Sequence, residues 1–260
     1  MKVQNYKTKI AILAVCGSFI PFSSALADEL YYNSTNGAGA VGVINSAGDH
    51  TTIKSYSPGS FAIGWTNIVK TLKHILYYNS TNGAGAVGIL DSTGNHTTIK
   101  SYPPGSFSTG WTNIITTPNR ILYYNSANGA GAVGVLNSAG NHTTIKGYPP
   151  GSFSTGWTTI VNTPNGILYY NSTNGAGAVG VINSAGAHIT IKGYPPGSFT
   201  TGWTKIVNTP YGNFYYNSAN GAGAVGVLDS AGNHATIKSY FPGSFSTGWT
   251  KIIDTFSPRL

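Results

Sequence analysis

The feature that most constrains this chain is a regular spacing of its aromatic residues. Each tryptophan follows the previous one by 46 residues, and pairs of adjacent tyrosines keep the same step. The tryptophans are Trp65, Trp111, Trp157, Trp203 and Trp249, and the tyrosine pairs begin at Tyr31, Tyr77, Tyr123, Tyr169 and Tyr215. Such a period indicates a repeat architecture, with units that start near residues 30, 76, 122, 168 and 214.

One unit contains four short stretches with the composition of β-strands. In the copy that runs from Gly110 to Phe153 these are Trp111 to Thr116, Ile121 to Asn125, Ala132 to Leu136 and His142 to Tyr148. Turn residues separate them, and Pro149-Pro150-Gly151 ends the last one, because proline cannot donate to a strand ladder. No stretch shows a helical period with caps. The unit is therefore predicted to be all-β.

Four strands in a unit of this length are typical of a propeller blade, so we predict an all-β fold, a five-bladed β-propeller of four-stranded blades. The chain enters at Leu30, in the second strand of a unit, and its last strand at 248–254 is the first strand of a unit. Pairing this C-terminal strand with the three N-terminal strands at 30–56 would close the ring and cover both free edges. The alternative, an open solenoid, would need distinct polar caps at its ends.

The N-terminus has the three-part layout of a secretory signal peptide. Lysines at positions 2, 7 and 9 precede an apolar run at 10–22, and Ala25-Leu26-Ala27 follows it. Cleavage is expected between Ala27 and Asp28, which leaves 28–260 as the propeller and 1–27 as the signal peptide. The product is expected to be secreted, extracellular or periplasmic, without membrane insertion, since no stretch approaches the roughly 20 apolar residues of a membrane span.

The single cysteine, Cys16, lies in the segment expected to be removed, so disulfides and thiol chemistry are not expected. The alternative is a lipoprotein acylated at this residue. Charged residues make up only 8% of the chain, and the lysines are spread over the units instead of forming a stripe. Nucleic acid is therefore not expected as a partner.

Enzymatic activity, cofactors and metal ions are also not expected. Asp91 and Asp229 occupy a position that is asparagine in other units, so no recurring acid-base pair can be built. The glycines that begin at Gly37 fit a dinucleotide-binding pattern, but they lead into a strand instead of a helix. One histidine per unit begins the outermost strand, and fivefold symmetry would keep these side chains too far apart to share a metal.

The remaining signal is a set of polar and aromatic loops. In an up-and-down blade, the loops after the second and fourth strands emerge on the same face, where they bring amides, hydroxyls and aromatic rings together without charge. These groups suit a neutral sugar, whose hydroxyls need directional partners and whose apolar face needs an aromatic platform. Whether the tryptophans are core or pocket wall is left open. The predicted ligand-binding residues are Asn33, Asn36, Ser60, Phe61, Trp65, Asn79, Asn82, Ser106, Phe107, Trp111, Asn125, Asn128, Ser152, Phe153, Trp157, Asn171, Asn174, Ser198, Phe199, Trp203, Asn217, Asn220, Ser244, Phe245 and Trp249.

Several motifs resemble the tachylectin-type five-bladed propeller lectins. They are the Gly110-Trp111 start of an inner strand, the Pro118-Asn119 turn, the Ile121-Leu122-Tyr123 second strand and the 46-residue step. The resemblance covers the whole chain after the signal peptide. It implies binding of N-acetylated hexosamines, such as N-acetylglucosamine or N-acetylgalactosamine, in shallow pockets between adjacent blades.

The expected function is thus a secreted, monomeric, multivalent lectin for cell-surface glycans, in which several weak sites act together. Two alternatives stay open at this point. One is a secreted protein-interaction, adhesion or matrix scaffold that binds no sugar. The other is a recently amplified repeat protein with little selected binding.

Overall fold

A computed structural model describes residues 29–44, 50–209 and 211–248, and within them the chain forms nineteen strands in five antiparallel sheets. The first sheet contains β1 (Glu29–Tyr32), β2 (Gly39–Ile44) and β3 (His50–Tyr56). The second contains β4 (Asn67–Lys70), β5 (Ile75–Tyr78), β6 (Gly85–Leu90) and β7 (His96–Tyr102). The third contains β8 (Asn113–Thr117), β9 (Arg120–Tyr124), β10 (Gly131–Leu136) and β11 (His142–Tyr148). The fourth contains β12 (Thr159–Thr163), β13 (Gly166–Tyr170), β14 (Gly177–Ile182) and β15 (His188–Tyr194), and the fifth contains β16 (Lys205–Thr209), β17 (Gly212–Tyr216), β18 (Gly223–Leu228) and β19 (His234–Tyr240).

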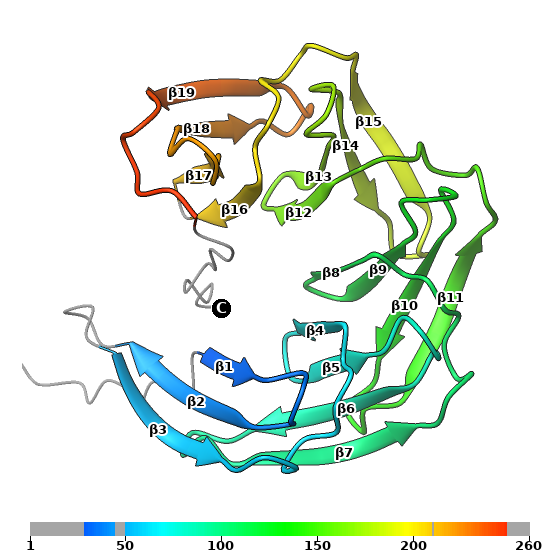
Figure 1. Cartoon of the computed structure of the whole chain (residues 1–260). Coiled ribbons are helices and arrows are strands. Elements are labelled where there is room, and N and C mark those ends of the chain that lie inside the picture. The colour runs from blue at the N-terminus through cyan, green and yellow to red at the C-terminus, as the bar shows by residue number, and fades with distance from the viewer. Residues whose placement is uncertain (1–28, 45–49, 210, 249–260) are drawn as a thin grey trace, which may run out of the picture.

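The five sheets stand around a common centre, and the predicted five-bladed β-propeller is confirmed (Figure 1). The innermost strands β4, β8, β12 and β16 lie toward the centre, and neighbouring ones contact each other. The ring excludes the open solenoid. The predicted strands of the third blade agree with β8 to β11 to within two residues. The predicted closing strand and the signal peptide lie outside the described residues.

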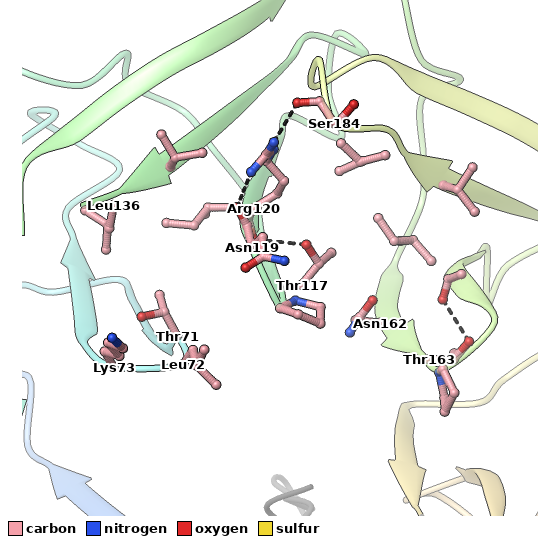
Figure 2. Close-up of a pocket in the computed structure, with 18 of the residues that line it drawn as sticks. Thr71, Leu72, Lys73, Thr117, Asn119, Arg120, Leu136, Asn162, Thr163 and Ser184 are labelled. Atoms are coloured by element: carbon pink, nitrogen blue, oxygen red, sulfur yellow. Dashed lines mark hydrogen bonds between the residues drawn. The ribbon is translucent and has the colours of Figure 1, made fainter. Parts of the chain in front are cut away.

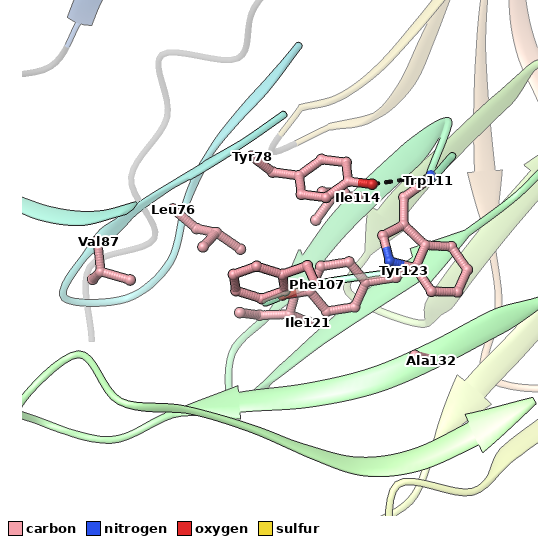
Figure 3. Packing of buried hydrophobic residues seen from close by; sticks show 9 residues of the cluster. All are labelled: Leu76, Tyr78, Val87, Phe107, Trp111, Ile114, Ile121, Tyr123 and Ala132. Carbon is pink, nitrogen blue, oxygen red and sulfur yellow. Dashed lines mark hydrogen bonds between the residues drawn. The ribbon is translucent and has the colours of Figure 1, made fainter. Parts of the chain in front are cut away.

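Apolar side chains fill the space between adjacent blades, because the inner strands of each sheet carry them on both faces. Between the second and third blades, Leu76 and Tyr78 pack against Phe107, Trp111 and Tyr123, all buried (Figure 3). The same cluster recurs between the third and fourth blades and between the fourth and fifth. Burial of these rings supplies the main driving force for assembling the ring of blades.

Within each blade, a histidine of the outermost strand reaches across the third strand to a tyrosine of the second. In the third blade, Nε2 of His142 lies 3.0 Å from the hydroxyl of Tyr123. The ring crosses directly over Gly134 of β10, where an added Cβ would collide with Nε2 of His142. The glycine in this strand is therefore required by the close approach of the imidazole.

A β-bulge on the outermost strand of each of the first four blades directs one isoleucine toward the next blade. In β7 the register with β6 shifts between Val87 and Gly88, which leaves Ile99 without an opposite residue. Ile99 then packs on Gly140 of the third blade, a turn residue with a φ of 75°. Beside this contact, Tyr102 donates its hydroxyl to the carbonyl of Gly140 at 2.9 Å. The outer rims of adjacent blades are thus joined by apolar and polar contacts together.

Replacing Gly134 with alanine is expected to lower the free energy of unfolding by about 1–3 kcal/mol, because the added methyl group displaces the His142 ring. The matched control is Gly147→Ala on the neighbouring strand β11, where an added Cβ has nothing within 4 Å. Urea denaturation of both variants checks this. Equal stability of the two variants would contradict the proposed packing.

Replacing Asn213 with isoleucine is expected to stabilise the protein by about 1–2 kcal/mol, because Oδ1 of Asn213 is buried without a hydrogen-bond partner. The equivalent residues Ile75, Ile121 and Ile167 show that the fold accepts isoleucine there. Thermal denaturation measures the gain. The reciprocal change Ile167→Asn should destabilise, and a lower melting temperature for Asn213→Ile would refute the account.

Candidate functional site

The ring carries two kinds of pocket, at opposite ends of its strands. The junction pockets are lined by loops after the second and fourth strands of the blades, and three of them occur within the described residues. Their volumes are about 540, 540 and 390 Å³. The hairpin pocket, of about 1290 Å³, lies at the other end and is lined mainly by the turns between the first and second strands (Figure 2).

The structure brings the sequence-predicted residues together in the junction pockets. Between the second and third blades, Ser106, Phe107 and Trp111 line one pocket with Asn125 and Asn128. The amides come from the blade that follows the serine and phenylalanine. The equivalent sets are Ser152, Phe153, Trp157, Asn171 and Asn174, and Ser198, Phe199, Trp203, Asn217 and Asn220.

The loops after the second and fourth strands of one blade lie together, as the sequence predicts. The N–H groups of Gly105 and Phe107 donate to the carbonyls of Asn82 and Gly83 at 2.8 and 2.9 Å. Equivalent bonds join the loops of Asn36 and Phe61. Among the remaining predicted residues, Asn33, Ser60, Trp65, Asn79, Ser244 and Phe245 hold equivalent positions, and Trp249 lies outside the described residues.

The aromatic residues of a junction pocket belong to the core and to the pocket wall at once. Phe107 is 8% exposed and Trp111 is 9% exposed, yet both line the pocket. The amides are largely engaged in shaping the loop. Oδ1 of Asn125 accepts the N–H of Ala127, and Oδ1 of Asn128 accepts the N–H of Ala130, both at 2.9 Å.

The histidines at these pockets are held in the neutral form by burial. Desolvation lowers the pKa of His142 to about 4. It also lowers the pKa of His96, His188 and His234. A neutral imidazole is consistent with the adjacent tyrosine hydroxyl and with the packing of Phe107 on His142, whose ring centroids are 4.9 Å apart.

The melting temperature is expected to fall as the pH is lowered from about 6.5 to about 4. In this pH range the histidines bind protons in the unfolded state but stay neutral in the folded state. Their contribution to the free energy of unfolding is therefore complete above about pH 6.5 and is lost as the pH falls toward 4. The aspartates act at lower pH, since hydrogen bonds from Thr93 and Asn95 hold the pKa of Asp91 at about 2. Thermal melts across this range test the effect. His142→Gln should flatten the dependence, and a constant melting temperature would contradict it.

The hairpin pocket collects turns from four blades. Its lining comes from the hairpins near 71–74, 117–121, 162–167 and 208–209 and from the loops at 135–138 and 181–184. Lys73, His74 and Arg120 contribute the ionisable side chains of the lining, which contains no aspartate or glutamate among the described residues. The pocket therefore has a positive potential and neutral amide groups.

Two of these basic groups have well-defined environments. His74 is 7% exposed and belongs to the pocket lining, and its ring makes no hydrogen bond to another described residue. Its own backbone N–H is held by the hydroxyl of Thr71 at 3.0 Å. Arg120 donates from Nη1 to the carbonyl of Asn119 at 2.7 Å and from Nη2 to that of Ser184 at 2.6 Å (Figure 2).

The site predicted from the sequence was built on residues that recur in every unit. The hairpin pocket was missed because its ionisable residues do not recur. The hairpins begin with the same threonine, at Thr71, Thr117, Thr163 and Thr209. The positions that follow differ between the units. Lys73 corresponds to Asn119, Asn165 and Tyr211, and His74 corresponds to Arg120, Gly166 and Gly212. Departures from the repeat were therefore the signal that could have found it.

A second departure occurs in the first blade. Glu29 occupies the position of Ile75, and its carboxylate lies 3.1 Å from Nε2 of His50 and accepts a 2.6 Å hydrogen bond from Tyr31. This contact ties β1 to β3 across Gly42. In the part of the chain that the structure describes, no group of three or more histidine, cysteine or carboxylate side chains is arranged to hold a metal ion.

Comparisons with known proteins match the fold. No family model and no curated protein matches the chain. Among solved structures, it is similar to a protein from Lactobacillus plantarum, with 13% identity and a TM-score of 0.56 over 84% of this chain and 67% of that one. It is also similar to the periplasmic gluconolactonase of Pseudomonas aeruginosa, with 14% identity and a TM-score of 0.53 over 84% and 67%. A putative 6-phosphogluconolactonase from Bacteroides uniformis gives 13% identity and a TM-score of 0.51 over 84% and 73%.

These comparisons correct the functional expectation. The prediction of a tachylectin-type lectin or scaffold without enzymatic activity is wrong against them, because two of the structures that share the fold are named a periplasmic gluconolactonase and a putative 6-phosphogluconolactonase. Of the motifs that suggested a lectin, Trp111 and the strand residues Ile121 and Tyr123 are buried where blades pack, so they serve the fold. At identities of 13–14%, the likeness shows the shared propeller fold.

Proposed function

We propose that the hairpin pocket binds a sugar lactone and hydrolyses it to the open acid. The observation that carries the proposal is His74, a buried histidine of the pocket lining whose ring makes no hydrogen bond within the described residues, in a lining that also contains Lys73, Arg120 and asparagine amides. The names of the gluconolactonases that share the fold support the choice of a lactone as the ligand.

The chemistry requires addition of water to the lactone carbonyl. His74 is the general base that takes a proton from the water as the new carbon–oxygen bond forms. The lysine and arginine of the pocket stabilise the negative charge that develops on the carbonyl oxygen. The ring carbon–oxygen bond then breaks, and the leaving oxygen receives the proton from the imidazolium, which yields a hydroxyl group and a carboxylic acid.

Neutral groups of the pocket suit the hydroxyls of a sugar. Asn162 and Asn208 come from the fourth and fifth blades and are half-buried, so their amides are available to donate and to accept hydrogen bonds. Ile121 and Ile167 add apolar groups to the lining. A polyhydroxylated ring with one apolar face matches this combination.

We further propose that the protein acts after export, with residues 1–27 as its signal peptide and 28–260 as the propeller. The periplasmic location named for the Pseudomonas aeruginosa gluconolactonase is compatible with this. Within the described residues, no helix has the length and hydropathy needed to cross a membrane. The monomeric state remains a prediction from the sequence.

Replacing His74 with glutamine is expected to lower kcat for a gluconolactone by about 10²–10⁴-fold, because the general base is lost while the shape of the side chain is kept. Proton release in weakly buffered solution, corrected for spontaneous hydrolysis, measures the rate. His50→Gln in the first blade is the matched control and should keep full activity. A wild-type rate equal to that of buffer, or full activity of His74→Gln, would refute the proposal.

A further inference from the structure

We infer that the ligand of the hairpin pocket carries an anionic group, a carboxylate or a phosphate. The inference rests on the hairpin pocket being the binding site of the proposed function. It adds the charge of the ligand and a stoichiometry of one per ring.

The ionisable residues of the pocket come from the second and third blades. Lys73 and His74 belong to the β4–β5 hairpin, and Arg120 belongs to the start of β9. These hairpins are neighbours, since the hydroxyl of Thr116 donates to the carbonyl of Lys70 at 2.8 Å. The fourth and fifth blades contribute Asn162, Asn208 and other uncharged groups to the lining. The second and third blades thus supply the positive charges of the lining, with Nη2 of Arg120 reaching the carbonyl of Ser184 in the fourth blade.

The positive charge of Arg120 is not neutralised within the described residues. Two of the five guanidinium N–H groups are used, and both bond to backbone carbonyls. Nε is buried without a partner, and no carboxylate of the described residues forms an ion pair with Arg120 or Lys73. An uncompensated charge in a partly desolvated pocket is unfavourable, and an anion in the ligand offsets that cost.

The repeats show that this arrangement occurs once within the described residues. In the fourth and fifth blades, the position of Lys73 holds asparagine or tyrosine, and the position of Arg120 holds glycine. The junction pockets repeat from blade to blade, whereas the positively charged residues of the hairpin pocket do not. One anionic ligand per chain is therefore expected.

The repeats also supply the substitutions for a test. Lys73→Asn and Arg120→Gly each introduce the residue that another unit carries at the same position, so the fold already accommodates them. Lys100→Gln on the exposed outer strand β7 removes a positive charge away from the pocket and is the matched control. Because Arg120 also holds Ser184, Arg120→Lys is added as a variant that keeps the charge.

Isothermal titration calorimetry of the whole chain with gluconate, 6-phosphogluconate and the neutral polyol glucitol measures the binding. One site per chain is expected, with gluconate or 6-phosphogluconate binding at least about tenfold more tightly than glucitol. Lys73→Asn and Arg120→Gly should each lower the affinity for the acid by about tenfold or more. Arg120→Lys should retain most of the affinity, and Lys100→Gln should retain all of it. Preference for 6-phosphogluconate over gluconate identifies phosphate as the group bound, and equal binding identifies the carboxylate.

The two proposals fail in different ways. Tight binding of the acids without lactone hydrolysis contradicts the proposed function and leaves the anion site in place. Hydrolysis together with equal affinity for glucitol and the acids, or with unchanged affinity in both charge-removing variants, overturns the anion site alone. Five equivalent sites in the titration would overturn it as well.

Discussion

The structure depends on one buried tyrosine per blade that is held at both ends. The ring of Tyr78 lies in the apolar cluster between blades, and its hydroxyl donates to the carbonyl of Ser108 at 2.8 Å and lies 3.3 Å from the N–H of Trp111. The same pair of bonds recurs at Tyr124 and Tyr170. A buried hydroxyl must be satisfied, so this geometry fixes the loop that crosses from one blade to the next.

Because that loop is fixed in every blade, the two ends of the ring differ in how much their residues vary between units. The end with the junction pockets is nearly identical from unit to unit, since any change there would disturb packing on Phe107 and its equivalents. The hairpin end bears less of the packing, and its turns differ in charge and size. Variation is tolerated where blades do not depend on each other, and function is best sought there.

Much of the fold could be predicted from the sequence because the determinants are local and repeated. The proline pair after Tyr148 and the alternation within each unit indicate the strands, and the 46-residue period indicates the ring. The hairpin pocket could not be predicted in the same way. His74 and Arg120 are far apart in sequence and line one pocket only because the inner strands of different blades converge, and both residues depart from the repeat. The motifs that resembled a lectin describe how blades are built and carry no information on what such a ring binds.

The near-identity of the blade junctions has a consequence for how the chain assembles. The contact between the second and third blades uses the same residue types as the contacts between later blades, so each unit offers its neighbours the same surface. Specific recognition between particular units therefore does not decide the order of the blades. The order of the blades is set by the short connections between units, since these keep consecutive units at high local concentration. During synthesis or refolding at high protein concentration, units of two chains compete for the same partners, and exchange of blades between molecules is the characteristic error of such a design.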